Sequence, residues 1–294
     1  MKGLSDIMQT VSMMKWVVLV SVLTMASGYK HVVFMHGILA GPSEFDKFAQ
    51  QIKIDHPGTN TTQINAFVDA YSLEPMWNQV EKIQIIFTQI MADNPDGIHL
   101  VCFSQGGLVC RGLMSLLQHN VDTFIGLSCP LAGQYGDTAY LKYLFPNYVK
   151  SNIYRYFYTD NGQKWSVANY WYDPHHQDEY HKFSTYLAIL NNDTHNGQSQ
   201  TFKENFSRLK KMVLVGGPDD GVITPWQSSH FGMYNGSEVV LPMQEQRWYK
   251  EDSFGLRTLY ERKAITTFTY SGVQHIHWHS DMDVYKKSVE PFLT

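Results

Sequence analysis

The chain has 294 residues and a formal net charge of −4 at neutral pH; 44% of the residues are hydrophobic and 17% are charged. This length suits one large domain, or a domain with an insertion, that buries a sizeable core. The charge is close to balanced and lysine and arginine form no runs, so the sequence lacks the electrostatic footprint of a nucleic-acid-binding protein. Three cysteines cannot all pair, which excludes a disulfide framework.

The N-terminus predicts a secretory signal peptide over residues 1–28. Lys15 precedes an apolar run over residues 16–25, and the small residues Ala26, Ser27 and Gly28 follow. A basic residue, a short apolar core and a small-residue end are the parts of such a signal, with cleavage expected after Gly28. The apolar run is too short to cross a bilayer comfortably, so we expect no stable membrane span. The alternative is a buried N-terminal helix.

Four Asn-x-Ser/Thr sequons support a secretory route. They lie in polar, turn-like stretches of the sequence, and each is a candidate glycosylation site. The acceptor residues are Asn60, Asn192, Asn205 and Asn235.

The elements after the signal alternate between strand and helix. Strands are predicted over residues 30–35, 62–68, 98–103 and 123–127, and helices over 46–54 and 76–91 and directly after residue 104. Strands that alternate with helices of ten to fifteen residues indicate βαβ units and a mainly parallel, doubly wound sheet. The fold class is therefore α/β.

Residues 130–206 have a different character, because they are dense in Phe, Tyr and Trp and carry no period-two strand signal. We interpret them as a mostly helical cap inserted into a single domain that spans residues 29–294. Strands are predicted again over 211–215 and 264–270, and a last helix over 283–292.

All three cysteines lie in apolar surroundings near the sheet. One disulfide bond could form, but we expect three small buried hydrophobic side chains.

Ser104 lies between a buried strand and a helix and is followed by Gln105, Gly106 and Gly107. This layout indicates a nucleophile elbow, in which a serine is held on a sharp turn above a parallel sheet. The glycine that usually comes two residues before the serine is replaced by Cys102, which is small enough to fit. The alternative is an ordinary turn between a strand and a helix.

A serine nucleophile needs a base, and the acid and the histidine are expected to follow it in that order along the chain. After the strand 211–215 come Asp219 and Asp220, of which we favour Asp220. After the strand 264–270 come His275, His277 and His279; His279 is nearest the last helix and is the predicted base.

A zinc site is the alternative for these three histidines, because on a strand they would face one side. No acidic or cysteine partner lies at a suggestive spacing, so we expect no metal. Asp173, His175 and His176 are a second candidate metal patch, for which an ordinary turn is the better interpretation.

The developing oxyanion needs two backbone N–H donors. The residue after the nucleophile, Gln105, supplies one, and the loop after the first strand supplies the other, for which we predict Ile38.

With these parts placed, the chain resembles the palmitoyl-protein thioesterase family of lysosomal α/β-hydrolases over residues 32–291. The resemblance is carried by residues 99–111, 133–137, 169–176 and 216–227. It implies a luminal, glycosylated enzyme without a cofactor that hydrolyses long-chain fatty acyl thioesters, with Ser104, Asp220 and His279 as its triad. The destination it implies is the lysosome, with secretion as the alternative. An oxygen-ester lipase and a non-catalytic lipid-binding relative are the competing functions.

Overall fold

The computed structural model of the chain describes residues 28–294 with the exception of residue 195. The predicted signal peptide therefore lies outside the described residues, apart from Gly28. Within the described part of the chain, no helix combines the length and the apolar character needed to cross a membrane.

Six parallel strands form one sheet in the order β2-β1-β3-β4-β5-β8. The predicted α/β class with a mainly parallel sheet is confirmed. The strands are β1 (His31–Met35), β2 (Thr61–Gln63), β3 (Ile98–Phe103), β4 (Val121–Leu127), β5 (Lys211–Gly216) and β8 (Ile265–Thr269).

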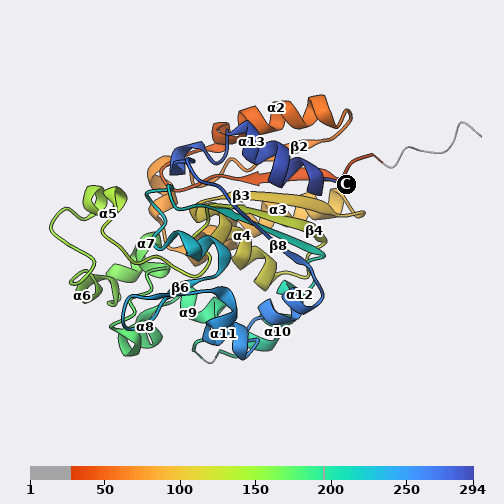
Figure 1. The fold of residues 1–294 in the computed structure, drawn as a ribbon. Coiled ribbons are helices and arrows are strands. Elements are labelled where there is room, and N and C mark those ends of the chain that lie inside the picture. Colours follow the sequence, from red (N-terminus) through yellow and green to blue (C-terminus); the bar gives the residue numbers. More distant parts are fainter. Residues whose placement is uncertain (1–27, 195) are drawn as a thin grey trace, which may run out of the picture.

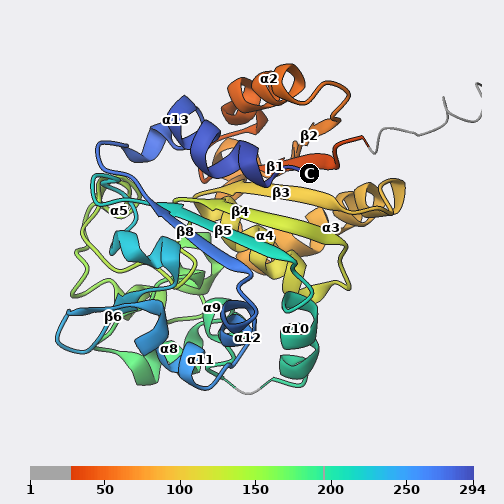
Figure 2. The same cartoon turned by 45° about the vertical axis from the view of Figure 1, so that its right-hand side comes forward.

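The two central strands are buried along their whole length, as expected for a parallel sheet with both faces covered. On one face, α2 (Asp46–Asp55) and the C-terminal helix pack on side chains such as Phe34, Val101 and Val213. On the other face, α3 (Met76–Asp93) and α4 (Gln105–Leu116) pack on Leu100 and Leu214. Figures 1 and 2 show these two helical layers on either side of the sheet.

Most predicted element boundaries agree with the structure to within two residues, and β2 is the clearest exception. The predicted strand 62–68 is present only as Thr61–Gln63, and Phe67 inside the predicted range has a positive φ of 56°, which an extended strand does not contain. The predicted last helix is present as a continuous helical stretch made of α13 (Met282–Val284), a π-helical segment η7 (Tyr285–Val289) and a short 3₁₀ turn η8 (Glu290–Phe292).

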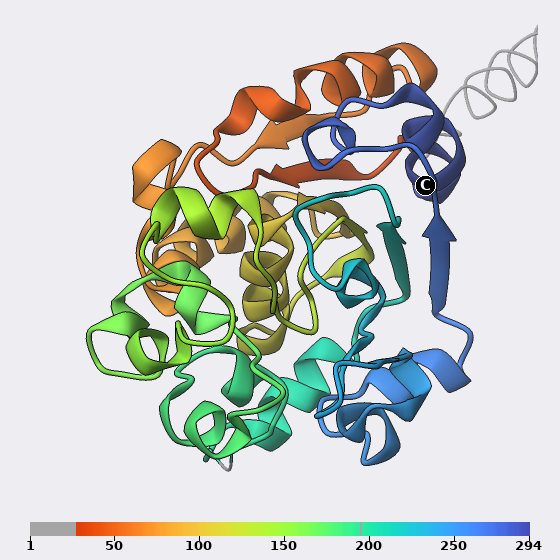
Figure 3. The same cartoon turned by 60° about the vertical axis from the view of Figure 1, so that its left-hand side comes forward.

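The chain between β4 and β5 forms short helices. Figure 3 brings this green segment forward. Its last helix, α10, packs against α4 beneath the sheet. The helices are α5 (Ala139–Leu144), α6 (Tyr154–Phe157), α7 (Ser166–Asn169), α8 (Gln177–Phe183), α9 (Leu187–Leu190) and α10 (Ser199–Phe206).

A smaller set of elements lies between β5 and β8. The hairpin β6 (Met233–Tyr234) and β7 (Val240–Leu241) is antiparallel, and α11 (Arg247–Lys250) and α12 (Leu256–Glu261) follow it.

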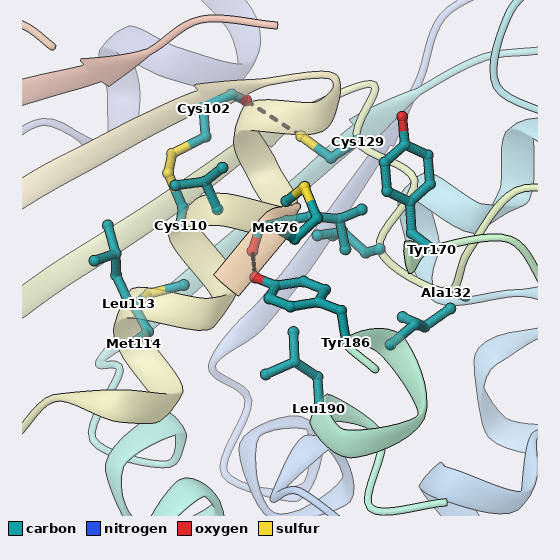
Figure 4. Close-up of a cluster of buried hydrophobic side chains, with 14 of the residues drawn as sticks. Met76, Cys102, Cys110, Leu113, Met114, Cys129, Ala132, Tyr170, Tyr186 and Leu190 are labelled. Carbon is teal, nitrogen blue, oxygen red and sulfur yellow. Dashed lines mark hydrogen bonds between the residues drawn. A yellow bond between two sulfur atoms is a disulfide. The ribbon is translucent and has the colours of Figure 1, made fainter. Parts of the chain in front are cut away.

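One cysteine expectation is wrong. Cys102 on β3 and Cys110 on α4 form a disulfide, visible in Figure 4, and Cys129 alone remains a buried thiol. The two cysteines are eight residues apart in sequence, and the turn at Ser104 folds α4 back along β3 until their Cα atoms are 6.8 Å apart. That distance lies within the range a disulfide can bridge.

Candidate active site

The site lies where the strand order reverses. From β1 the chain goes to β2 on one side, whereas β3 pairs with the other side of β1. In a doubly wound sheet, such a reversal opens a crevice at the carboxyl ends of the strands. Ile38 follows β1 and Ser104 follows β3, so two of the predicted site residues flank this crevice.

Ser104 occupies a sharp turn with φ 51° and ψ −129°, a backbone conformation that side chains other than glycine rarely adopt. The two glycines that follow allow the tight approach of α4. A Cβ atom on Gly106 would lie 2.4 Å from the carbonyl oxygen of His36, and one on Gly107 would lie 2.2 Å from the Cys129 sulfur. The predicted elbow is therefore present, and its glycines face the loops after β1 and β4.

A buried chain of hydrogen bonds links Ser104, His275 and Asp220. The Ser104 Oγ lies 2.9 Å from His275 Nε2, and His275 Nδ1 lies 2.8 Å from Asp220 Oδ2. All three residues are nearly inaccessible to solvent, with exposed fractions of 4%, 4% and 3%. With Nδ1–H donating to the carboxylate, Nε2 is left to accept the serine proton, which is the arrangement a serine nucleophile requires.

Further donors surround the Asp220 carboxylate. Oδ1 accepts the backbone N–H groups of Val222 and Ile223 at 2.9 and 2.6 Å. Oδ2 accepts the Ser128 hydroxyl at 2.5 Å and the Trp278 indole N–H at 2.7 Å, in addition to the histidine. Neither Ser128 nor Trp278 was expected from the sequence, where no local pattern marks them.

Burial pushes the pKa of Asp220 upward, but the hydrogen bond from His275 and the other donors outweigh burial and leave the pKa below its ordinary value. The carboxylate therefore stays ionised. The choice between the two neighbouring aspartates follows from the geometry, because Asp219 is exposed and, among the described residues, accepts only the Gly272 N–H in the loop beyond β8.

The structure does not bring the predicted base, His279, to Ser104. Its Nδ1 donates to the Glu44 carbonyl oxygen at 2.7 Å, and His275 occupies the place expected for it. Nearness to the last helix, the basis for predicting His279, does not decide the base, because residues 275–277 form a 3₁₀ turn that sets the side-chain directions. The turn points His275 into the sheet edge and leaves His277 exposed.

The same turn removes the geometry of the zinc alternative, which needed the three histidines on one side of a strand. In the second candidate patch, the Asp173 carboxylate accepts the His175 N–H at 2.8 Å and faces His176 Nδ1 at 2.9 Å, as in a side-chain-capped turn. Over residues 28–294 without 195, no group of three His, Cys, Asp or Glu side chains is arranged to hold a metal ion.

Ile38 and Gln105, the predicted oxyanion donors, come from the loop after β1 and the first residue of α4. A Cβ atom on Gly37 would lie 3.2 Å from Ser104 Cβ, so the β1 loop passes directly beside the serine. Ile38 and Ser104 line the same pocket.

That pocket is partly open to solvent, and Ser104 is one of the residues that line it. Apart from Gln134, Thr138 and the serine, its walls are apolar or aromatic, and most of them come from the segment between β4 and β5. The remaining lining residues are Ile38, Pro130, Tyr140, Leu141, Leu144, Phe145, Phe157, Val167, Tyr170, Trp171, Val222 and Ile223.

One of the four sequons is incompatible with the fold. Asn205 lies within α10 rather than in a turn, is 4% exposed, and donates its amide to the Ser115 carbonyl oxygen at 3.0 Å. A glycan on that nitrogen could not be accommodated. Asn60 is exposed, and Asn192 and Asn235 are half-buried.

Comparison with known proteins gives the family. The model of the palmitoyl protein thioesterase family matches residues 31–275. The chain belongs to this family. It is 47% identical over 269 residues to the human protein named lysosomal thioesterase PPT2, covering 91% of this chain and 89% of the human one. To the Drosophila melanogaster homolog it is 40% identical over 282 residues, covering 94% and 98% of the two chains.

Solved structures agree with this membership at the level of the fold. The mature form of the Bacillus licheniformis lipase BlEst2 superimposes with a TM-score of 0.50 at 15% identity, covering 91% of this chain and 94% of that one. Aspergillus fumigatus lipase B gives 0.51 at 11% identity, covering 91% and 54%. At such identities the likeness shows a shared α/β-hydrolase fold alone.

Proposed function

We propose that the protein hydrolyses long-chain fatty acyl thioesters, with Ser104 as nucleophile, His275 as base and Asp220 as acid. The observation that carries the proposal is the buried hydrogen-bonded chain Ser104–His275–Asp220, whose serine lines an apolar pocket. The names of the relatives support the substrate class, because they are called lysosomal thioesterases.

In the first step the Ser104 Oγ attacks the thioester carbonyl carbon while His275 Nε2 takes the hydroxyl proton. The ionised Asp220 stabilises the resulting imidazolium. Collapse of the tetrahedral intermediate breaks the carbon–sulfur bond, and the thiol leaves with a proton from His275. Water activated by the same imidazole then hydrolyses the acyl-enzyme and releases the fatty acid.

The acyl chain would lie in the apolar pocket that Ser104 lines. An elongated hydrocarbon gains free energy when it leaves water for such walls, at about 0.8 kcal/mol per buried CH₂ group. We therefore propose the segment over residues 130–206 as a cap that covers the chain, with Leu141, Phe145 and Trp171 among its contacts. The backbone N–H groups of Ile38 and Gln105 would hold the oxyanion.

The proposal includes a route through the secretory pathway to the lysosome, as the names of the relatives suggest. A signal peptide over residues 1–28 and glycans on Asn60, Asn192 and Asn235 fit that route.

The deciding experiment compares wild-type protein with Ser104→Ala on palmitoyl-CoA and on an oxygen ester of the same fatty acid. We expect the wild type to hydrolyse the thioester faster, and the variant to lose about 10⁴-fold or more of that activity. A variant with near-normal turnover would refute the role of Ser104. Hydrolysis of the oxygen ester alone would point to a lipase or esterase, and lipid binding without turnover would point to a non-catalytic relative.

A further inference from the structure

The loop after β1 presents three successive peptide N–H groups near Ser104. The first, on Gly37, donates to Glu44 Oε2 at 3.1 Å, and the third, on Leu39, donates to Ser72 Oγ at 2.7 Å. The middle N–H belongs to Ile38 and has no hydrogen-bond partner among the described residues. The peptide N–H groups on both sides of Ile38 are thus fixed by side chains. The Ile38 N–H between them is left available, and Ile38 is one of the residues that line the pocket.

Glu44 is itself fixed. It lies in the 3₁₀ turn η1 (Pro42–Phe45), and its backbone carbonyl oxygen accepts the His279 Nδ1–H at 2.7 Å. The Nε2 atom of the same ring lies 3.7 Å from Glu44 Oε1. The side chains of Glu44 and His279 are 20% and 14% exposed, so the pair is largely shielded from solvent.

Ser72 holds the other side of the loop and lies in the 3₁₀ turn η2 (Asp69–Leu73). It is 1% exposed, and its hydroxyl donates to the Asp69 carbonyl oxygen at 2.6 Å, which leaves the Oγ lone pairs facing the Leu39 N–H. Its own carbonyl oxygen accepts the amide of Gln105 at 2.7 Å and that of Gln79 at 2.8 Å. Ser72 therefore connects the loop of Ile38 to Gln105, the residue that carries the second proposed oxyanion donor.

We propose that Glu44 and Ser72 are positioning residues that hold the Ile38 N–H in the direction of the oxyanion. This inference rests on the proposed function and names how its oxyanion site is preorganised. A donor aimed before the reaction stabilises the developing charge without reorganising, whereas a loop freed on one side spends part of its time with that donor misdirected. His279, the residue first expected to be the base, contributes by holding Glu44.

The expected effect is on the chemical step and not on substrate binding. Loss of a whole oxyanion donor lowers kcat by about 10²–10³-fold, so a donor that is only poorly aimed should cost about 10- to 100-fold. Among the described residues, Ile38 is the single one of this loop that lines the acyl pocket, so most of the pocket wall is unaffected and KM should change much less than kcat, within about twofold of the wild type.

The experiment uses the full chain with Glu44→Ala and Ser72→Ala, and with Glu44→Gln as the matched control. Glutamine keeps a carbonyl oxygen at the same reach for the Gly37 N–H, so we expect it to restore most of kcat. Glu44→Asp keeps the charge but shortens the side chain, and it should behave like Glu44→Ala. Thermal melting measures whether each variant is folded. If Glu44→Ala is not folded, Glu44→Asp takes its place in the comparison.

Two inhibitors separate positioning from general damage. A hexadecyl trifluoromethyl ketone forms a covalent bond from Ser104 Oγ to its carbonyl carbon, passing the hydroxyl proton to His275 and leaving an oxyanion. S-hexadecyl-CoA is a thioether that lacks the thioester carbonyl oxygen, so it places no oxygen at the oxyanion position. Glu44→Ala and Ser72→Ala should weaken the ketone by about 10- to 100-fold, in step with kcat, and leave the thioether unchanged.

Equal losses for both inhibitors, or no loss for either, would overturn the proposal. So would a Glu44→Gln variant as poor as Glu44→Ala. If instead the wild type shows no thioesterase activity, the proposed function has failed, and this outcome is distinct from a wild type that works and variants that do not differ from it.

Discussion

At the scale of single residues, two histidines four positions apart have different surroundings. The 3₁₀ turn directs His275 between Ser104 and Asp220 and places His279 against Glu44. Both rings contact Phe103, with centroid distances of 4.9 Å, so proximity to the sheet edge does not separate them. Only His275 has both nitrogens engaged with a nucleophile and a carboxylate.

We therefore expect unequal effects from alanine at the two histidines. His275→Ala removes the base and should lower kcat/KM for palmitoyl-CoA by about 10⁴-fold or more. His279→Ala leaves the hydrogen-bonded chain intact and loosens only Glu44, so its loss should be about tenfold or less. Labelling of Ser104 by a fluorophosphonate provides an independent measurement. Strong labelling in His275→Ala together with none in His279→Ala would reverse the assignment.

At the scale of elements, the disulfide joins the strand before the nucleophile to the helix after it. Cys102 is the last but one residue of β3, two residues before Ser104, and Cys110 lies in the second turn of α4. The elbow residue with positive φ lies inside this short covalent loop. The bridge thus restrains the segment in which the strained backbone occurs.

We expect the double variant Cys102→Ala, Cys110→Ala to be less stable than the wild type by about 2–3 kcal/mol. The disulfide lowers the entropy of the unfolded chain, and for a loop of this size that loss corresponds to a free energy of about 2–3 kcal/mol. Denaturant unfolding measures the difference. Reductant should lower the stability of the wild type toward that of the double variant and leave the double variant unchanged. Equal stability of the two proteins in oxidising buffer would contradict the structural role of the bridge.

At the scale of the whole molecule, histidines buried away from the site link stability to pH. His99 Nε2 accepts the Thr294 N–H at 2.9 Å, and His119 Nδ1 accepts the Val121 N–H at 3.1 Å, so both rings are needed in their neutral form. Burial lowers the pKa of each from 6.5 to about 4. Between these values the unfolded chain binds protons that the folded chain does not, so stability falls as the pH drops from 6.5 toward 4.

We expect the free energy of unfolding to fall by about 1–2 kcal/mol for each of these histidines between pH 7 and pH 5. Asparagine at position 119 keeps an acceptor near Nδ1 but does not titrate. His119→Asn should therefore show a shallower loss of stability over this range than the wild type, as measured by urea unfolding at both pH values. Parallel pH dependence in the two proteins would exclude His119 as a contributor.

Local sequence is enough to predict the order of strands and helices, the elbow at Ser104 and the aspartate pair that contains the acid, because each depends on neighbours in the chain. Buried strands are continuous apolar runs, and an elbow needs small residues directly after its serine. Which of the three nearby histidines reaches the serine depends on the folded chain, because the 3₁₀ turn over residues 275–277 directs His275 toward Ser104.

Contacts between different elements of the fold also explain the other differences between the predictions and the structure. The Cys102–Cys110 bond forms because α4 folds back on β3, and Asn205 is buried because α10 packs on α4. Glu44, Ser72, Ser128 and Trp278 come from four separate segments and carry no local signal. Their hydrogen bonds exist only once the sheet brings together the segments that follow β1, β2, β4, β5 and β8.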